Sequence, residues 1–132
     1  DSGRYQVRDS ERLRSPTFGP WTPNEFVRSF TDQNFEEEVL SSRIPVVVDF
    51  WAETCTPCRL QEPTIQRLGV QLHERVKVGR IDVYQTPDTT EAFRVKGVPH
   101  LLVVSHGRVL LELVGDHSFE QLLSHLRSVE LI

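Results

Sequence analysis

The chain has 132 residues, of which 38% are apolar and 26% charged, and its formal net charge is −4. This length suits one compact domain with its own core. The interspersed charges provide no basic surface of the kind that nucleic acids require. No apolar run approaches the roughly 20 residues that span a bilayer. The sequence begins at Asp1 and contains no Met, so we expect a processed or trimmed product, which leaves the compartment open.

The N-terminal region differs in composition from the rest of the chain. Residues 1–14 are polar and charged without periodicity, and residues 15–23 are rich in Pro and Gly. This pattern predicts an extended tail over residues 1–23 and a domain over residues 24–132. The alternative is a docking arm that lays Phe18 and Trp21 on the domain surface.

Regular structure is predicted to begin with a short strand over Phe26–Phe30. Asp32 can then cap a helix that runs to about Leu40. Residues 45–51 are rich in valine and aromatic side chains and predict a buried strand, in which Asp49 is the one acid. Burying an ionised carboxylate is costly, so we expect the pKa of Asp49 to be raised, unless this residue faces outward at an edge.

A helix is predicted after this strand, kinked at Pro63, and a further strand over residues 76–83. Thr86 is a candidate N-cap with a Pro at the first helical position, which predicts a short helix through Phe93. Two more strands, 101–104 and 109–114, are joined around His106-Gly107 in a hairpin pattern. Ser118 and Gln121 form a capping box before an amphipathic helix, whose apolar face is Phe119, Leu122, Leu123, Leu126 and Val129. The predicted order is β-α-β-α-β-α-β-β-α, a mixed sheet with helices on both faces.

Cys55 and Cys58 carry all the sulfur of the chain, in the sequence Cys-Thr-Pro-Cys at the junction of a strand and a helix. A bridge over so few residues constrains little chain, so a structural disulfide is disfavoured and redox chemistry is favoured. A zinc site would need two of the five His residues as further ligands, and no pair of them has a suitable spacing. A papain-like nucleophile is disfavoured because the second Cys would trap it as a disulfide.

The segment VVDFWAETCTPC, residues 47–58, resembles the active-site segment of thioredoxins. The resemblance covers about residues 24–130 and continues through Pro63, Ile81-Asp82, Gly97-Val98-Pro99, Gly107 and Gly115. It implies an α/β thioredoxin fold, with a central mixed sheet of about five strands flanked by four helices. It also implies a monomeric thiol–disulfide oxidoreductase without cofactor or metal, which reduces disulfides of client proteins and receives electrons from a reductase such as thioredoxin reductase. A cytoplasmic location is expected, with an exported compartment as the alternative.

The resemblance implies that Cys55 attacks the client, Cys58 resolves the mixed disulfide, and Asp49 handles the proton. The start of a helix favours the thiolate of Cys55 on physical grounds as well, because unpaired N–H groups and the helix dipole face its sulfur. The resemblance further implies a cis peptide bond at Val98-Pro99. The expected substrate-binding residues are Trp51, Thr56, Pro57, Val98, Pro99 and His100.

Several residues depart from the usual thioredoxin pattern. Thr54 replaces a second Trp, Thr56 a Gly and Arg59 a Lys, and Val78 falls where many members carry a Lys that pairs with the buried Asp. His100 either lies near Cys55 and stabilises its thiolate or points away from it. These changes leave two alternatives open, an oxidant, isomerase or pathway-specific donor in an oxidising compartment, and a protein-interaction module.

Overall fold

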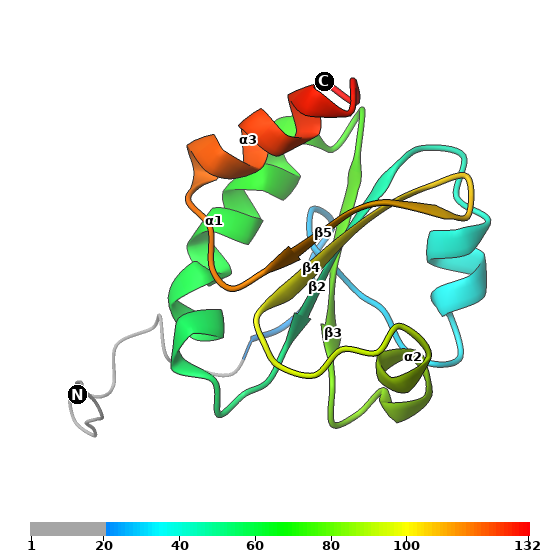
Figure 1. The fold of residues 1–132 in the computed structure, drawn as a ribbon, viewed down its shortest axis with the longest axis vertical. Coiled ribbons are helices and arrows are strands. Elements are labelled where there is room, and N and C mark those ends of the chain that lie inside the picture. Colours follow the sequence, from blue (N-terminus) through cyan, green and yellow to red (C-terminus); the bar gives the residue numbers. More distant parts are fainter. Residues whose placement is uncertain (1–20) are drawn as a thin grey trace.

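The computed structural model describes residues 21–132, and these form one mixed sheet covered by helices (Figure 1). The strand order is β1-β3-β2-β4-β5. The first three strands run parallel, whereas β4 is antiparallel to both β2 and β5. The strand bounds are β1 (Arg28–Ser29), β2 (Val46–Trp51), β3 (Lys77–Asp82), β4 (His100–Ser105) and β5 (Arg108–Val114). Phe18, proposed as part of a docking arm, lies outside the described residues.

Four helices occur in the described part of the chain, and they cover both faces of the sheet. They are a short π-helix, η3 (Glu36–Leu40), and the α-helices α1 (Thr56–Leu72), α2 (Pro87–Ala92) and α3 (Phe119–Ser128). Figure 1 shows α1 and α3 together on one face, with η3 and α2 on the other. The predicted order of elements and the mixed sheet are therefore confirmed.

Each face of the sheet buries its own hydrophobic cluster. The cluster beneath α1 and α3 includes Val47 and Leu68, and the cluster on the opposite face includes Val48 and Phe50. Successive side chains of a strand point to opposite faces. Asp49, which lies between Val48 and Phe50, therefore faces the α1 layer, where the cysteines are.

The prediction that Asp32 caps the helix ending near Leu40 is wrong. Its carboxylate instead accepts hydrogen bonds at the start of α2, from the Thr89 amide at 2.9 Å, the Thr89 hydroxyl at 2.7 Å and the Asp88 amide at 3.2 Å. Thr86 is the N-cap residue of α2 but makes no side-chain capping bond, so Asp32 supplies this cap from a distant segment.

Other local predictions are confirmed. Ser118 and Gln121 make both hydrogen bonds of the capping box, and the pair His106-Gly107 turns between β4 and β5 with φ angles of 52° and 78°. Positive φ at both positions is the conformation of a tight two-residue hairpin turn. The first strand is shorter than predicted, because only Arg28–Ser29 pair with β3.

Candidate active site

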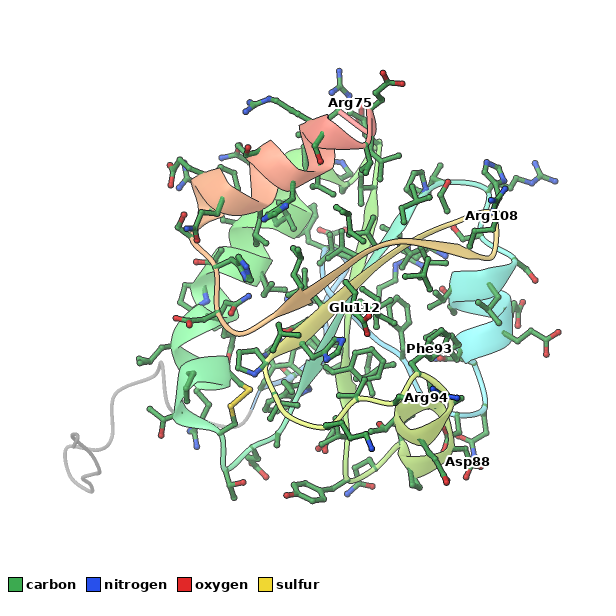
Figure 2. The ribbon with its side chains drawn as sticks, in the orientation of Figure 1. Arg75, Asp88, Phe93, Arg94, Arg108 and Glu112 are labelled. Carbon is green, nitrogen blue, oxygen red and sulfur yellow. A yellow bond between two sulfur atoms is a disulfide. The ribbon has the colours of Figure 1, made fainter. Side chains whose placement is uncertain are left out.

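Cys55 and Cys58 form a disulfide at the N-terminal end of α1, drawn as a yellow bond in Figure 2. Cys55 is the N-cap residue, and its Sγ accepts a hydrogen bond from the Cys58 amide at 3.2 Å. Cys55 is partly exposed, whereas Cys58 is fully buried. Thr56 and Pro57 between them are exposed. A partner molecule can therefore reach Cys55 but not Cys58, as expected of an attacking and a resolving thiol.

The loop before β4 lies against the disulfide. The Val98–Pro99 peptide bond is cis, as the resemblance implied. Cys55 Sγ lies 3.7 Å from the carbonyl oxygen of Val98. Val98 is partly exposed and Pro99 is buried. This loop thus brings a backbone edge to the accessible sulfur.

Asp49 is linked to Cys58 through Arg80, which binds both residues. Asp49 is only 1% exposed, so the buried interpretation of this residue is correct. Burial raises its pKa, the charge and hydrogen bond of Arg80 lower it, and the nearby Glu62 carboxylate raises it again. The net result is a pKa of about 6, above the ordinary 3.8. Oδ1 of Asp49 has no hydrogen-bond partner among the described residues.

Arg80 is the residue of this site that the sequence reasoning missed. Val78 stands where many thioredoxins carry the Lys that pairs with the buried Asp, so no cationic partner is expected from that position. The parallel register instead places Arg80, two residues on, directly beside Asp49. Its Nε donates to Asp49 Oδ2 at 2.8 Å and its Nη2 to the carbonyl oxygen of Cys58 at 3.2 Å. One lone acid in a buried strand and one lone Arg in the next predicted strand were the available signal.

Trp51 and His100 are more buried than a client-binding role suggests. Trp51 is 6% exposed, and its ring lies 4.3 Å from the Arg80 Cζ. His100 is also 6% exposed; its Nε2 lies 2.8 Å from a Glu112 carboxylate oxygen, and its ring meets Phe50 edge-on at 6.0 Å. These contacts place His100 on the face opposite α1. The structure therefore favours the interpretation in which His100 points away from Cys55.

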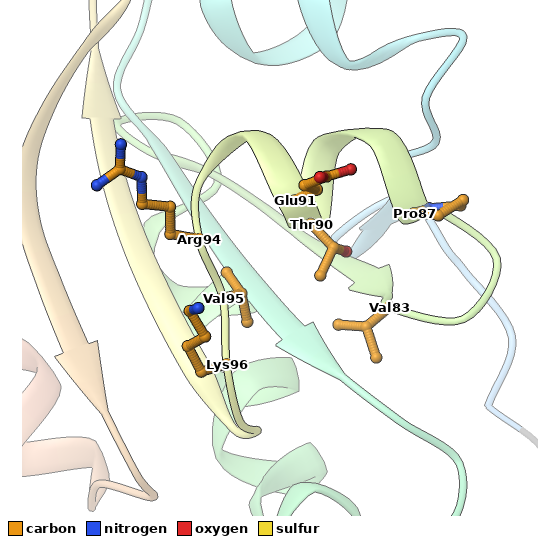
Figure 3. A pocket seen from close by; sticks show the side chains of 7 residues that line it. All are labelled: Val83, Pro87, Thr90, Glu91, Arg94, Val95 and Lys96. Atoms are coloured by element: carbon orange, nitrogen blue, oxygen red, sulfur yellow. The ribbon is translucent and has the colours of Figure 1, made fainter.

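A surface pocket of about 680 Å³ lies along α2 and the loop that follows it (Figure 3). None of the predicted site residues lines this pocket. Its lining residues are Val83, Pro87, Thr90, Glu91, Arg94, Val95 and Lys96. The chain continues directly from Lys96 to the loop that contacts Cys55, so the pocket borders the site without belonging to it.

Residues 21–132 also bear on two other classes of function, metal binding and membrane insertion. No group of three or more His, Cys, Asp or Glu side chains in this region could hold a metal ion. No helix in it is long and apolar enough to cross a membrane.

The sheet order and the partly exposed disulfide at a helix N-terminus are typical of proteins that carry out thiol–disulfide exchange. The family model described as Thioredoxin matches residues 26–128, and the chain belongs to the thioredoxin family. It is similar to a thioredoxin of Buchnera aphidicola subsp. Schizaphis graminum, with 42% identity over 70% of this chain and 85% of that protein. A thioredoxin of Rickettsia bellii is 35% identical over 74% of this chain and 93% of that protein. The protein is thus a thiol–disulfide oxidoreductase of the protein-disulfide reductase type.

Proposed function

We propose that Cys55 and Cys58 divide the reaction between them. In the reduced protein, the Cys55 thiolate attacks one sulfur of a client disulfide, which forms a mixed disulfide and releases one client thiolate. Cys58 then loses its proton and attacks the Cys55 Sγ, which reforms the Cys55–Cys58 disulfide and releases the second client thiolate. Two electrons pass to the client. The observation that carries this assignment is the contrast between accessible Cys55 and fully buried Cys58.

Asp49 accepts the proton of Cys58 in this proposal. Its burial and its pKa of about 6 support the role, because a carboxylate that holds a proton more tightly is a better base at neutral pH. Arg80 binds both Asp49 and the Cys58 carbonyl, so it fixes the base relative to the resolving residue.

The client peptide contacts the surface around Cys55. The exposed Thr56 and Pro57 lie on one side of the sulfur, and Val98 with Pro99 on the other, where the Val98 carbonyl lies near the sulfur. Trp51 is buried and supports this surface from beneath, whereas His100 lies on the opposite face and makes no contact with the client in this proposal. An extended peptide that pairs with the backbone of Val98 fits this arrangement.

We further propose that the protein is a cytoplasmic monomer, and that a reductase such as thioredoxin reductase supplies its electrons. The similarity to proteins named Thioredoxin supports the proposed electron donor. A redox titration tests the direction of electron flow. A reduction potential of about −270 mV for the cysteine pair fits a reductase. A potential between about −180 and −120 mV would fit the alternative of an oxidant or isomerase.

A trapping experiment tests the division between the two cysteines. Cys58→Ser is predicted to accumulate a mixed disulfide with a client such as insulin, because the second attack is removed. Cys55→Ser is predicted to form no such adduct and to lose turnover. Equal trapping by both variants would contradict the assignment.

A further inference from the structure

Trp21 packs on the active-site side of the domain although it precedes the residues that the family model matches, 26–128. The sequence places this residue in an extended tail, with a docking arm that lays it on the domain surface as the alternative. In the structure its ring is partly buried, packs against the cluster beneath α1 and meets the Trp51 ring edge-on, with centroids 5.8 Å apart. Trp21 is thus attached to the domain at the redox site.

The guanidinium of Arg80 lies against both indole rings. Its Cζ is 4.3 Å from the Trp51 ring centroid and 5.4 Å from that of Trp21. Both distances are within the range of cation–π attraction, which strengthens when the cation is desolvated. Arg80 is 0% exposed.

Within residues 21–132, hydrogen bonds satisfy only two of the three nitrogens of the buried Arg80 guanidinium. Nε and Nη2 are bound to Asp49 and Cys58, whereas Nη1 has no hydrogen-bond partner among the described residues and lies 3.7 Å from Glu62. Two aromatic rings, those of Trp51 and Trp21, also lie against the guanidinium. One of them comes from outside the family's common domain.

We propose that Trp21 is a positioning residue for disulfide exchange. Its indole covers the ion pair, which Arg80 keeps closed by its own hydrogen bond to Asp49, and it keeps water out, so that Asp49 takes up the Cys58 proton in a closed site. This inference rests on the proposed role of Asp49 as proton acceptor.

The charges around Asp49 fix the direction of the expected effect. Arg80 faces it from β3 and lowers its pKa, Glu62 faces it from α1 and raises it, and β4 places the apolar Leu101 beside it. Burial has the largest influence and raises the pKa. Removing the Trp21 ring admits water, so the pKa of Asp49 falls and the carboxylate becomes a weaker base.

The test uses the full chain with Trp21→Ala, and it follows the Asp49 side-chain carboxyl signal by NMR as the pH is varied. We expect the titration midpoint to move down by roughly half a pH unit or more. The rate at which Cys58 resolves a mixed disulfide at neutral pH should fall about two- to five-fold. Trp21→Phe keeps an aromatic face and is expected to restore both quantities towards wild type. Trp21→Leu keeps an apolar contact but no aromatic face, and it should shift the midpoint in the same direction as Trp21→Ala.

Phe26→Ala is the matched control. Phe26 lies in the same N-terminal segment and packs on the same cluster, but its ring contacts His73. This variant is expected to leave the Asp49 midpoint unchanged. An unshifted midpoint in folded Trp21→Ala or Trp21→Leu, or an equal shift in Phe26→Ala, would overturn the inference. If Asp49→Asn resolves the mixed disulfide as fast as wild type, the role of Asp49 fails, while the midpoint in the Trp21 variants still decides whether Trp21 closes the site.

Discussion

Arg80 and Asp49 lie side by side on neighbouring parallel strands, with Nε and Oδ2 2.8 Å apart and both side chains closed off from solvent. The pair lies between the sheet and the first turn of α1, where Arg80 also holds the Cys58 carbonyl. We therefore expect the burial of Asp49 to affect the stability of the protein and, in the proposed mechanism, the chemistry of its cysteines.

The dependence of stability on pH should reveal this burial. The pKa of Asp49 is raised from 3.8 to about 6 in the folded protein, so the folded state binds more protons than the unfolded state between these values. Asp49 thus lowers the free energy of unfolding as the pH rises through this window, by about 3 kcal/mol in total. Asp49→Asn lacks this titration.

Urea unfolding of wild type and Asp49→Asn from pH 3.5 to 7.5 measures the effect. All other titrating groups are shared, so the difference between the two curves isolates Asp49. The stability of wild type relative to the variant should fall as the pH rises. A constant difference would mean that Asp49 has an ordinary pKa.

Removing Arg80 should be strongly destabilising. Arg80→Leu leaves the Asp49 carboxylate buried without its counter-ion, and breaking a buried pair in this way costs about 3–5 kcal/mol. Arg80→Lys is the control, since it keeps the charge while losing the second hydrogen bond, and should cost less. Urea unfolding at pH 7 compares them, and equal losses would show that the charge is unimportant.

Gly69→Ala tests the packing between α1 and the segment before β1. Ala favours a helix over Gly by about 1 kcal/mol, but a Cβ at Gly69 would clash with the backbone oxygen of Phe26. The backbone cannot move aside easily, so we expect a net loss of roughly 1–3 kcal/mol. Gly97→Ala is the control, since nothing lies within 4 Å of a Cβ there. A stabilised Gly69→Ala in thermal unfolding would contradict the tight packing.

Asp32→Ala should weaken α2 rather than the helix that follows it in sequence. The variant removes three hydrogen bonds at the α2 N-terminus. Amide hydrogen exchange should become several-fold faster at Asp88 and Thr89, and the Tm should fall. Glu36→Ala, an exposed change in the first turn of η3, should leave these amides protected. Faster exchange confined to η3 would instead support the cap predicted from sequence.

The sequence predicted those features whose causes are local. The valine run around Val47, the turn at His106-Gly107 and the capping box at Ser118 each depend on residues a few positions apart. Cys55 and Cys58 were recognised because their motif is contiguous. Register and long-range caps are different, since they depend on which strands and segments meet in space. The position of Val78 in the sequence therefore does not reveal that Arg80 is the partner of Asp49.

Asp32 and His100 illustrate the same limit. Asp32 precedes one helix in sequence but caps another 57 residues away. His100 follows Pro99 directly, but strand alternation turns its ring to the face opposite the cysteines, against Phe50 and Glu112. The neighbours of Asp32 and His100 in sequence therefore did not determine where either side chain points.

In the proposed mechanism, Asp49 takes the proton of Cys58 when the mixed disulfide is resolved. The most direct measurement is the single-turnover rate of that step from pH 5 to 8, in wild type and in Asp49→Asn. We expect the wild-type rate to rise with pH, with a midpoint near the Asp49 pKa of about 6. The rate of Asp49→Asn should be lower and should not show this rise. Two superimposable profiles would contradict this role of Asp49.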